Sequence, residues 1–193
     1  MELKKYLKSR TLPSGWIMWK VSDKAQTASG ATPLTTRPSY YNGGDIPWIN
    51  SGELNESEVI TAHNFITQEG FDNSSTKMFP INTILIAMYG ATVGKSSLLK
   101  IEACTNQAIC AILPNNSFYS PFLKYYFEGI SSYLVSLSSG SARDNISQET
   151  IKNHTVFSPA TFSEQKKLVA LLENIDRKIV LNREINRNLP LAA

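Results

Sequence analysis

Three apolar segments in the middle of the chain have the pattern of neighbouring buried strands. Thr83 to Tyr89 is an almost continuous apolar run that stops at Gly90, which is typical of a strand buried on both faces. Segments 97–101 and 107–113 have similar patterns, and we expect them to flank it. Gly90 and Gly94 lie between the first two runs and predict a tight turn, because glycine accepts backbone angles that other residues avoid.

The segment before these runs predicts short strands separated by turns. Large apolar residues over 16–21 follow the turn 12–15 and indicate a strand. Turn clusters occupy 29–33 and 41–44. Segment 46–49 is another short strand, and Pro47 restricts it to a sheet edge or a strand start, because proline lacks a backbone N–H. The first three quarters of the chain therefore predict a mixed α/β domain.

Helical periodicity appears after residue 119. Ser120 and Pro121 predict a helix start, with serine as N-cap and proline at the first helical position. Apolar residues then recur three and four positions apart up to the serine- and glycine-containing segment 138–141. These residues are Leu123, Tyr126, Phe127, Ile130, Leu134 and Leu137.

The last segment predicts one long helix with an apolar seam. Thr161 and Glu164 have capping-box spacing, and no glycine or proline follows until after Asn188. The seam repeats with coiled-coil spacing. Its positions are Leu168, Leu172, Ile175 and Ile179, then Asn182, Asn186 and Leu189, with Leu181 and Ile185 on an adjacent stripe. A helix this long has either a partner helix or a path back onto its own domain; we expect the partner, with the seam asparagines fixing register.

Composition is that of a globular protein, with 42% hydrophobic and 18% charged residues. Residues 1–37 carry seven Lys/Arg and two acids, 38–76 carry six acids and no Lys/Arg, and 77–193 carry twelve Lys/Arg and eight acids. The basic parts would attract a polyanion, although from charge alone ordinary solvated charge is the favoured explanation. No apolar run reaches the length of a membrane span, and two cysteines six apart suit a reducing compartment. We therefore expect a cytoplasmic protein.

Segment 90–96, Gly-Ala-Thr-Val-Gly-Lys-Ser, resembles a phosphate-binding loop but is one residue too short. Such a loop also leads into a helix and needs a later strand ending in Asp for magnesium, whereas Ser97 onward has the pattern of a strand. Nucleotide hydrolysis is therefore the least favoured function for this chain. His63 and His154 lack metal-ligand spacing, so we expect no metal site, and acids at 53, 56 and 58 are most simply a solvated loop.

Taken together, these segments resemble the specificity subunit of type I restriction–modification systems. Each match is weak alone, but their order and spacing cover nearly the whole chain. The matching segments are 12–16, 30–33, 45–49, 51–52, 79–80, 86–95, 105–108, 140–147, 158–159 and 164–165.

The resemblance implies an α+β fold: a mixed α/β target recognition domain with a twisted β-sheet and short helices (1–160), a long coiled-coil-type helix (161–189) and a tail (190–193). It implies a non-catalytic reader of one half of a bipartite double-stranded DNA target, with no cofactor of its own. Modification (methyltransferase) subunits would bind the helix, supply S-adenosylmethionine and methylate adenine, and a restriction subunit would cleave. Family members usually carry two recognition domains, so we expect a half-subunit or a fragment that pairs as a homodimer through its helix.

Phosphate contacts position a protein on DNA, and base-edge contacts specify the sequence. Four cations are candidates for phosphates: Lys95, Arg143, Lys24 and Lys20. Candidates for bases are Tyr40, Tyr41, Asn42, Asn50, Ser51, Asn73 and Ser74, although turn capping is an equal alternative for the asparagines. Expected loop-shaping residues are Gly90, Gly94, Asn106, Gln107, Gly140 and Asn145. The main competing interpretation is an assembly module that pairs through its helix without touching DNA.

Overall fold

A computed structural model describes residues 12–137 and 145–189 of the chain. Its centre is a five-stranded sheet in the order β2-β10-β7-β8-β4, in which only the β4–β8 pair is parallel. The strands are β2 (Thr27–Ser29), β4 (Glu58–Val59), β7 (Ile84–Ala87), β8 (Ser96–Leu99) and β10 (Ile109–Ile112). All residues of β7, β8 and β10 are buried, which confirms the predicted strands and their adjacency.

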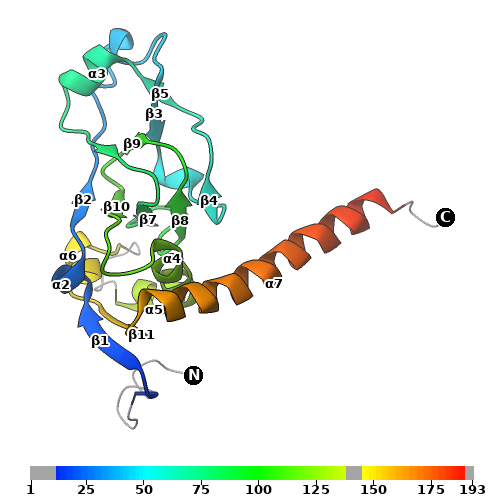
Figure 1. Cartoon of the computed structure of the whole chain (residues 1–193). Coiled ribbons are helices and arrows are strands. Elements are labelled where there is room, and N and C mark those ends of the chain that lie inside the picture. The colour runs from blue at the N-terminus through cyan, green and yellow to red at the C-terminus, as the bar shows by residue number, and fades with distance from the viewer. Residues whose placement is uncertain (1–11, 138–144, 190–193) are drawn as a thin grey trace.

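Two smaller sheets lie at either end of this one (Figure 1). The four-stranded sheet has the order β5-β3-β9-β6, and β1 pairs with β11 in an antiparallel ribbon. Their bounds are β1 (Trp16–Lys20), β3 (Ile46–Ile49), β5 (Phe65–Ile66), β6 (Met78–Phe79), β9 (Ala103–Thr105) and β11 (Thr155–Pro159). Strand β3 is not at an edge, but Pro47 is its second residue and pairs only toward β5, while Trp48 and Ile49 pair with β9. Proline therefore stands at the strand start, where β9 does not need its missing N–H.

Short helices cover the sheets. They are α2 (Val21–Lys24), the 3₁₀ turns η1 (Pro38–Tyr40) and η2 (Ser51–Glu53), and α3 (Gln68–Asp72), α4 (Ser120–Gly129), α5 (Ser131–Ser136) and α6 (Gln148–Lys152). The single helix expected after residue 119 is in fact two, because the backbone at Ile130 leaves helical geometry (φ −106°, ψ 9°). The N-cap is Tyr119, and Ser120 is already helical. The predicted apolar positions nevertheless pack against β7 and β8 in the main core.

Helix α7 (Phe162–Asn188) begins as the sequence predicts. The Thr161 hydroxyl accepts from the Glu164 N–H (3.3 Å) and donates to the Glu164 carboxylate (2.8 Å). Buried Gln165 fastens the first turn, because its amide accepts from the Tyr119 N–H (2.8 Å) and donates to the Pro159 carbonyl (3.0 Å). Val169 is the last fully buried residue of the helix.

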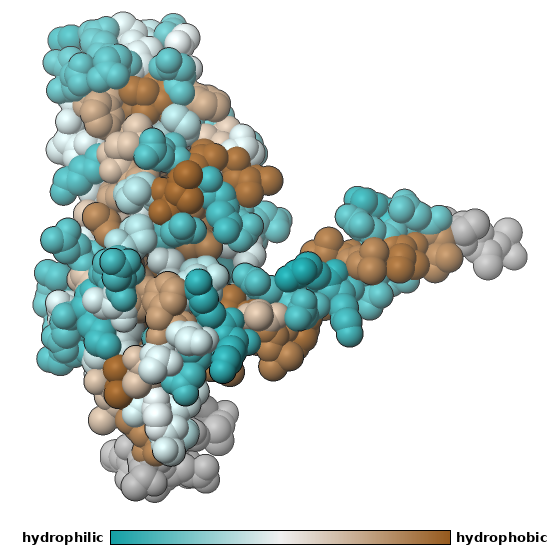
Figure 2. Space-filling view, in the orientation of Figure 1, coloured by the Kyte–Doolittle hydropathy of each residue, from teal (hydrophilic) through white to brown (hydrophobic). Residues whose placement is uncertain are grey.

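Beyond Val169, α7 projects away from the rest of the molecule (Figure 1). One hydrogen bond, from the Tyr125 hydroxyl of α4 to the Asp176 carboxylate (2.6 Å), supports it two turns further on. The four leading seam residues are 38–48% exposed, and Figure 2 shows the apolar surface that continues along the helix. The alternative in which α7 folds back along its length is therefore wrong. None of the helices within the described ranges is long and apolar enough to span a bilayer.

Candidate nucleic-acid interface

The glycine turn between β7 and β8 (residues 90–95) contacts η2 through a hydrogen bond. Gly90 and Gly94 have φ of +88° and +78°, the left-handed region that favours glycine. Within the turn, the Thr92 hydroxyl donates to the Ser51 carbonyl (2.7 Å). Lys95 is exposed, and its Nζ donates to the Asn55 side-chain oxygen (2.9 Å). The turn leads into strand β8, as predicted. Lys95 therefore does not lie at the start of a helix; it contacts Asn55, which follows η2.

Two asparagines stand at the ends of neighbouring strands: Asn50 follows β3 and Asn106 follows β9. With the glycine turn and η2 they form one cluster of polar groups. The Asn106 Nδ2 donates to the Asn50 Oδ1 (3.1 Å), and the Asn106 Oδ1 accepts from the Ala108 N–H (3.1 Å). Exposed Gln107 accepts from the Thr32 hydroxyl (2.6 Å). Asn106 thus links the loop backbone at Ala108 to the Asn50 side chain.

The expected solvated acidic loop is wrong for Glu53. Its side chain is only 11% exposed. One carboxylate oxygen accepts from the Asn50 N–H (2.9 Å) and the Asn64 Nδ2 (3.0 Å), and the other from the His63 N–H (3.0 Å). The sequence signal that could have found it is the Asn50–Glu53 spacing at the start of η2, which has the form of a capping box.

The remaining base-contact candidates lie apart, around η1 and α3. Tyr40 is only 5% exposed and packs against Gly70 of α3, so it is a core residue rather than a base reader. The Tyr41 hydroxyl donates to the Pro33 carbonyl (2.6 Å). Asn73 donates to the Glu69 carbonyl (2.9 Å) and Ser74 to the Phe71 carbonyl (3.3 Å), which is the turn-capping alternative. Asn42 is exposed after η1.

Lys20 and Lys24 belong to the other end of the fold. Lys20 ends β1, and the Lys24 Nζ lies 5.2 Å from the centre of the Trp19 ring. Arg143 and Gly140 fall outside the described residues. Asn145 bridges to Tyr89, and the Ile146 N–H donates to the Met88 carbonyl (2.7 Å). The chain therefore returns, after the segment that contains Arg143, directly beside the glycine turn.

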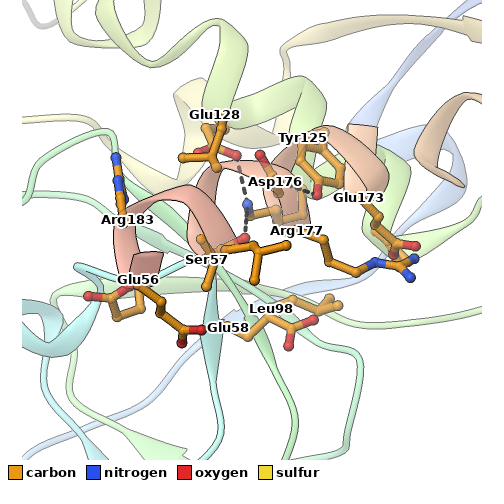
Figure 3. Close-up of a pocket in the computed structure, with 16 residues that line it drawn as sticks. Glu56, Ser57, Glu58, Leu98, Tyr125, Glu128, Glu173, Asp176, Arg177 and Arg183 are labelled. Carbon is orange, nitrogen blue, oxygen red and sulfur yellow. Dashed lines mark hydrogen bonds and ion pairs between the residues drawn. The ribbon is translucent and has the colours of Figure 1, made fainter. Parts of the chain in front are cut away.

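A separate groove of about 730 Å³ runs between α7, α4 and the β4–β8 edge of the main sheet (Figure 3). Six acids and three cations are among its lining residues. Lys124, the buried cation, donates to Ser57 and to the Glu128 carboxylate (2.6 Å for the latter). Because acids outnumber cations, this groove disfavours DNA phosphates and is distinct from the cluster around Lys95.

Both cysteines are buried. Burial raises the pKa of the Cys104 thiol to about 11 and that of the Cys110 thiol to about 12. Neither thiol is therefore ionised near neutral pH, so neither has the thiolate character of a nucleophile.

Residues 13–191 match the family model described as the type I restriction modification DNA specificity domain. The specificity subunit of the type I restriction enzyme MjaIX from Methanocaldococcus jannaschii is 31% identical over 183 residues, covering 92% of this chain and 42% of that protein. The EcoR124I/EcoR124II specificity subunit from Escherichia coli is 27% identical over 184 residues, covering 91% and 44%. The chain thus spans less than half the length of these relatives.

Solved structures share the fold. The HsdS subunit from Thermoanaerobacter tengcongensis superposes with a TM-score of 0.70 at 20% identity, over 92% of this chain and 41% of that one. A chain from a study of complex assembly in the type I R-M system gives a TM-score of 0.73 at 19% identity, over 92% and 42%. The mixed α+β architecture with its long C-terminal helix is therefore one that these structures also have.

Proposed function

Because this chain belongs to the family of type I restriction–modification DNA specificity domains, we propose that it is a non-catalytic DNA reader. It recognises one half of a bipartite target and directs adenine methylation, and cleavage where a restriction subunit is present, by partner subunits. The observation that carries this proposal is the family match over residues 13–191. The cluster of polar groups around the glycine turn supports it and gives it a surface.

In this proposal, Lys95 contacts a DNA phosphate, and Asn50 and Ser51 contact base edges. Lys95 is exposed and donates to Asn55, and Thr92 of the same turn donates to the Ser51 carbonyl. Asparagine can pair bidentately with adenine in the major groove. Arg143 is a second phosphate candidate, because the chain re-enters the described structure beside the turn at Asn145.

Helix α7 is proposed to set the spacing between two recognition units and to bind the modification subunits. Its exposed seam has coiled-coil spacing, and residues after Val169 leave the body of the domain. Two copies paired through this seam would form a dimer with two-fold symmetry, which reads an inverted repeat. Asn182 and Asn186 would fix the register of that pair at some cost in stability.

The competing proposal, an assembly module without DNA readout, draws on the same exposed seam and on the acid-rich groove. It leaves the cluster around Lys95 without a role. A nucleotide-binding enzyme is less well supported, because the turn before Lys95 leads into β8 rather than into a helix.

Methylation mapping tests the proposal. Cells that carry this chain with its modification subunit are compared, by sequencing of methylated adenines, with cells that carry the modification subunit alone. A bipartite motif that appears only with the chain is the expected result, and two-fold symmetry in that motif supports the homodimer. Absence of any chain-dependent motif, with the complex assembled, would leave the assembly module as the better account.

A further inference from the structure

The Glu53 carboxylate is surrounded by hydrogen-bond donors. Its Oε1 accepts from the Asn50 N–H at 2.9 Å and from the Asn64 Nδ2 at 3.0 Å. Its Oε2 accepts from the His63 N–H at 3.0 Å, with the His63 Nδ1 at 3.1 Å. Within residues 12–137 and 145–189, no Lys or Arg pairs with this carboxylate, so main-chain and amide donors hold its charge, with the His63 ring beside it.

These bonds join η2 to residues 63 and 64, two segments that no strand pairing connects. Strands β3 and β5 pair only through Ile46 and Pro47, and one further bond, from the Trp48 N–H to the Asn64 carbonyl (2.9 Å), extends the contact. Beyond that point Glu53 ties η2, which follows β3, to residues 63 and 64, which precede β5. The carboxylate therefore fixes where η2 lies relative to the four-stranded sheet.

Glu53 also positions Asn50 and Ser51, the residues proposed to contact bases. Its bond to the Asn50 N–H holds the backbone of Asn50, whose side chain pairs with Asn106. The next residue, Ser51, receives the hydroxyl of Thr92 on its carbonyl. Glu53 thus lies behind the cluster, with two donors on Oε1 and the His63 N–H on Oε2.

A carboxylate close to a surface that meets phosphates opposes binding, because like charges repel. The presence of a charge at this position is explained if it organises the loop rather than contacting DNA. Charge-assisted hydrogen bonds to a carboxylate are stronger than neutral ones and hold their donors in a narrower geometry. Base readout needs that narrow geometry, whereas phosphate attraction does not.

We propose that Glu53 is a positioning residue for sequence readout: it holds Asn50 and Ser51 at the proposed DNA surface and thereby sets selectivity, without contributing to general DNA affinity. This inference rests on the proposed function. It assigns to Glu53 a role distinct from that of Lys95, which would act on every sequence alike.

Glu53→Gln is the informative change because it keeps the shape and removes one acceptor. The new amide NH₂ must face either Asn50 and Asn64 or the two nitrogens of His63, so donor meets donor at one side of the group. The unpaired donors weaken the hold on η2. Glu56→Gln is the matched control, because Glu56 lies three residues away, is exposed and lines the separate groove.

The experiment uses the full chain in complex with its modification subunit. Wild type, Glu53→Gln and Glu56→Gln are compared by methylation mapping, and by fluorescence anisotropy on a duplex with the mapped motif and on its scrambled counterpart. For Glu53→Gln we expect about a tenfold loss of discrimination between the two duplexes, degenerate positions in every half-site that this chain reads, and no loss of affinity for the scrambled duplex. Glu56→Gln should match wild type in each measurement.

Two results would overturn the inference. One is an unaltered motif and discrimination ratio in Glu53→Gln; the other is an equal loss on both duplexes, which a merely structural or electrostatic role predicts. If Glu53→Gln melts well below wild type, Asn64→Ala decides by the same criteria, because it removes one donor and leaves the charge in place. Failure of the proposed function looks different, since wild type itself would then direct no motif.

Discussion

Acidification should destabilise the fold through His154. This side chain is 8% exposed and lies against the rings of Tyr126, Phe127 and Tyr133. Its Nε2 is 3.0 Å from the Tyr126 hydroxyl, which donates its one proton to the Thr155 carbonyl (3.1 Å). Both hydrogen bonds of the Tyr126 hydroxyl are formed when the neutral imidazole carries its hydrogen on Nε2 and donates it to the Tyr126 oxygen. Burial lowers the pKa of His154 from 6.5 to about 4, because the charged form loses hydration.

The sign follows from linkage. The unfolded chain, with the ordinary pKa, binds a proton more readily than the folded one, so stability falls as the pH drops below 6.5 and levels off near 4. Between about pH 7.5 and pH 5, a single group with these two pKa values costs about 2 kcal/mol of unfolding free energy. With an m-value of about 2 kcal/mol per molar urea, this equals about 1 M in the midpoint.

The assay is urea unfolding, followed by far-UV circular dichroism, at both pH values for wild type and His154→Gln. Glutamine does not titrate and keeps an amide that can donate to Tyr126. All other titrating groups are shared, so their contributions cancel in the difference between the two proteins. Wild type should lose about 2 kcal/mol more than the variant on acidification. Equal losses, within about 0.5 kcal/mol, would refute the assignment of a buried, neutral histidine.

Three other predictions concern the proposed phosphate contact, the seam and the close approach of two backbones. Lys95→Ala should weaken binding to matched and scrambled duplexes alike and reduce the salt slope by about one; an unchanged slope removes this lysine from the interface. Ile175→Ser should shift the chain toward monomer in sedimentation, whereas Leu181→Ser, off the seam, should not; equal effects would place the pairing surface elsewhere. Gly30→Ala should cost about 2 kcal/mol or more in urea unfolding, since a Cβ there would lie 1.8 Å from a backbone oxygen of β9, whereas Gly129→Ala, with open space around it, should cost nothing.

The elements that the sequence predicts well are those set by their own periodicity. The strand at β7 follows from a run of apolar residues. The start of α7 follows from a capping box whose two residues, Thr161 and Glu164, are three positions apart. The division between α4 and α5 leaves no such trace, because Ile130 keeps the helical spacing while its backbone departs from helical geometry. Tyr40 likewise reads as an exposed turn residue, and only the packing of η1 on α3 buries it.

Part of the candidate site was predictable, because Lys95, Ser51 and Asn106 lie in segments that resemble a known family and Asn50 lies between two such segments. Glu53 could not be placed in the same way. Its partners at 63 and 64 are ten and eleven residues further along the chain, and two of its three donors are main-chain N–H groups. Apart from the Asn50–Glu53 capping-box spacing, residue types carry no record of such donors, so an acidic segment looks solvated until the fold brings the donors to it.

This arrangement also explains how an acidic segment can belong to a surface proposed for DNA. Segment 38–76 has six acids and no Lys or Arg, which alone would argue against a polyanion. Donors satisfy Glu53, and Lys100 pairs with Glu58 at 3.1 Å, while Glu56 and Glu58 line the groove beside α7 rather than the cluster at the glycine turn. The proposed reading surface is therefore built mainly from amides and hydroxyls with few cations. Such a surface suits discrimination between sequences better than general attraction of DNA, as the proposed function requires.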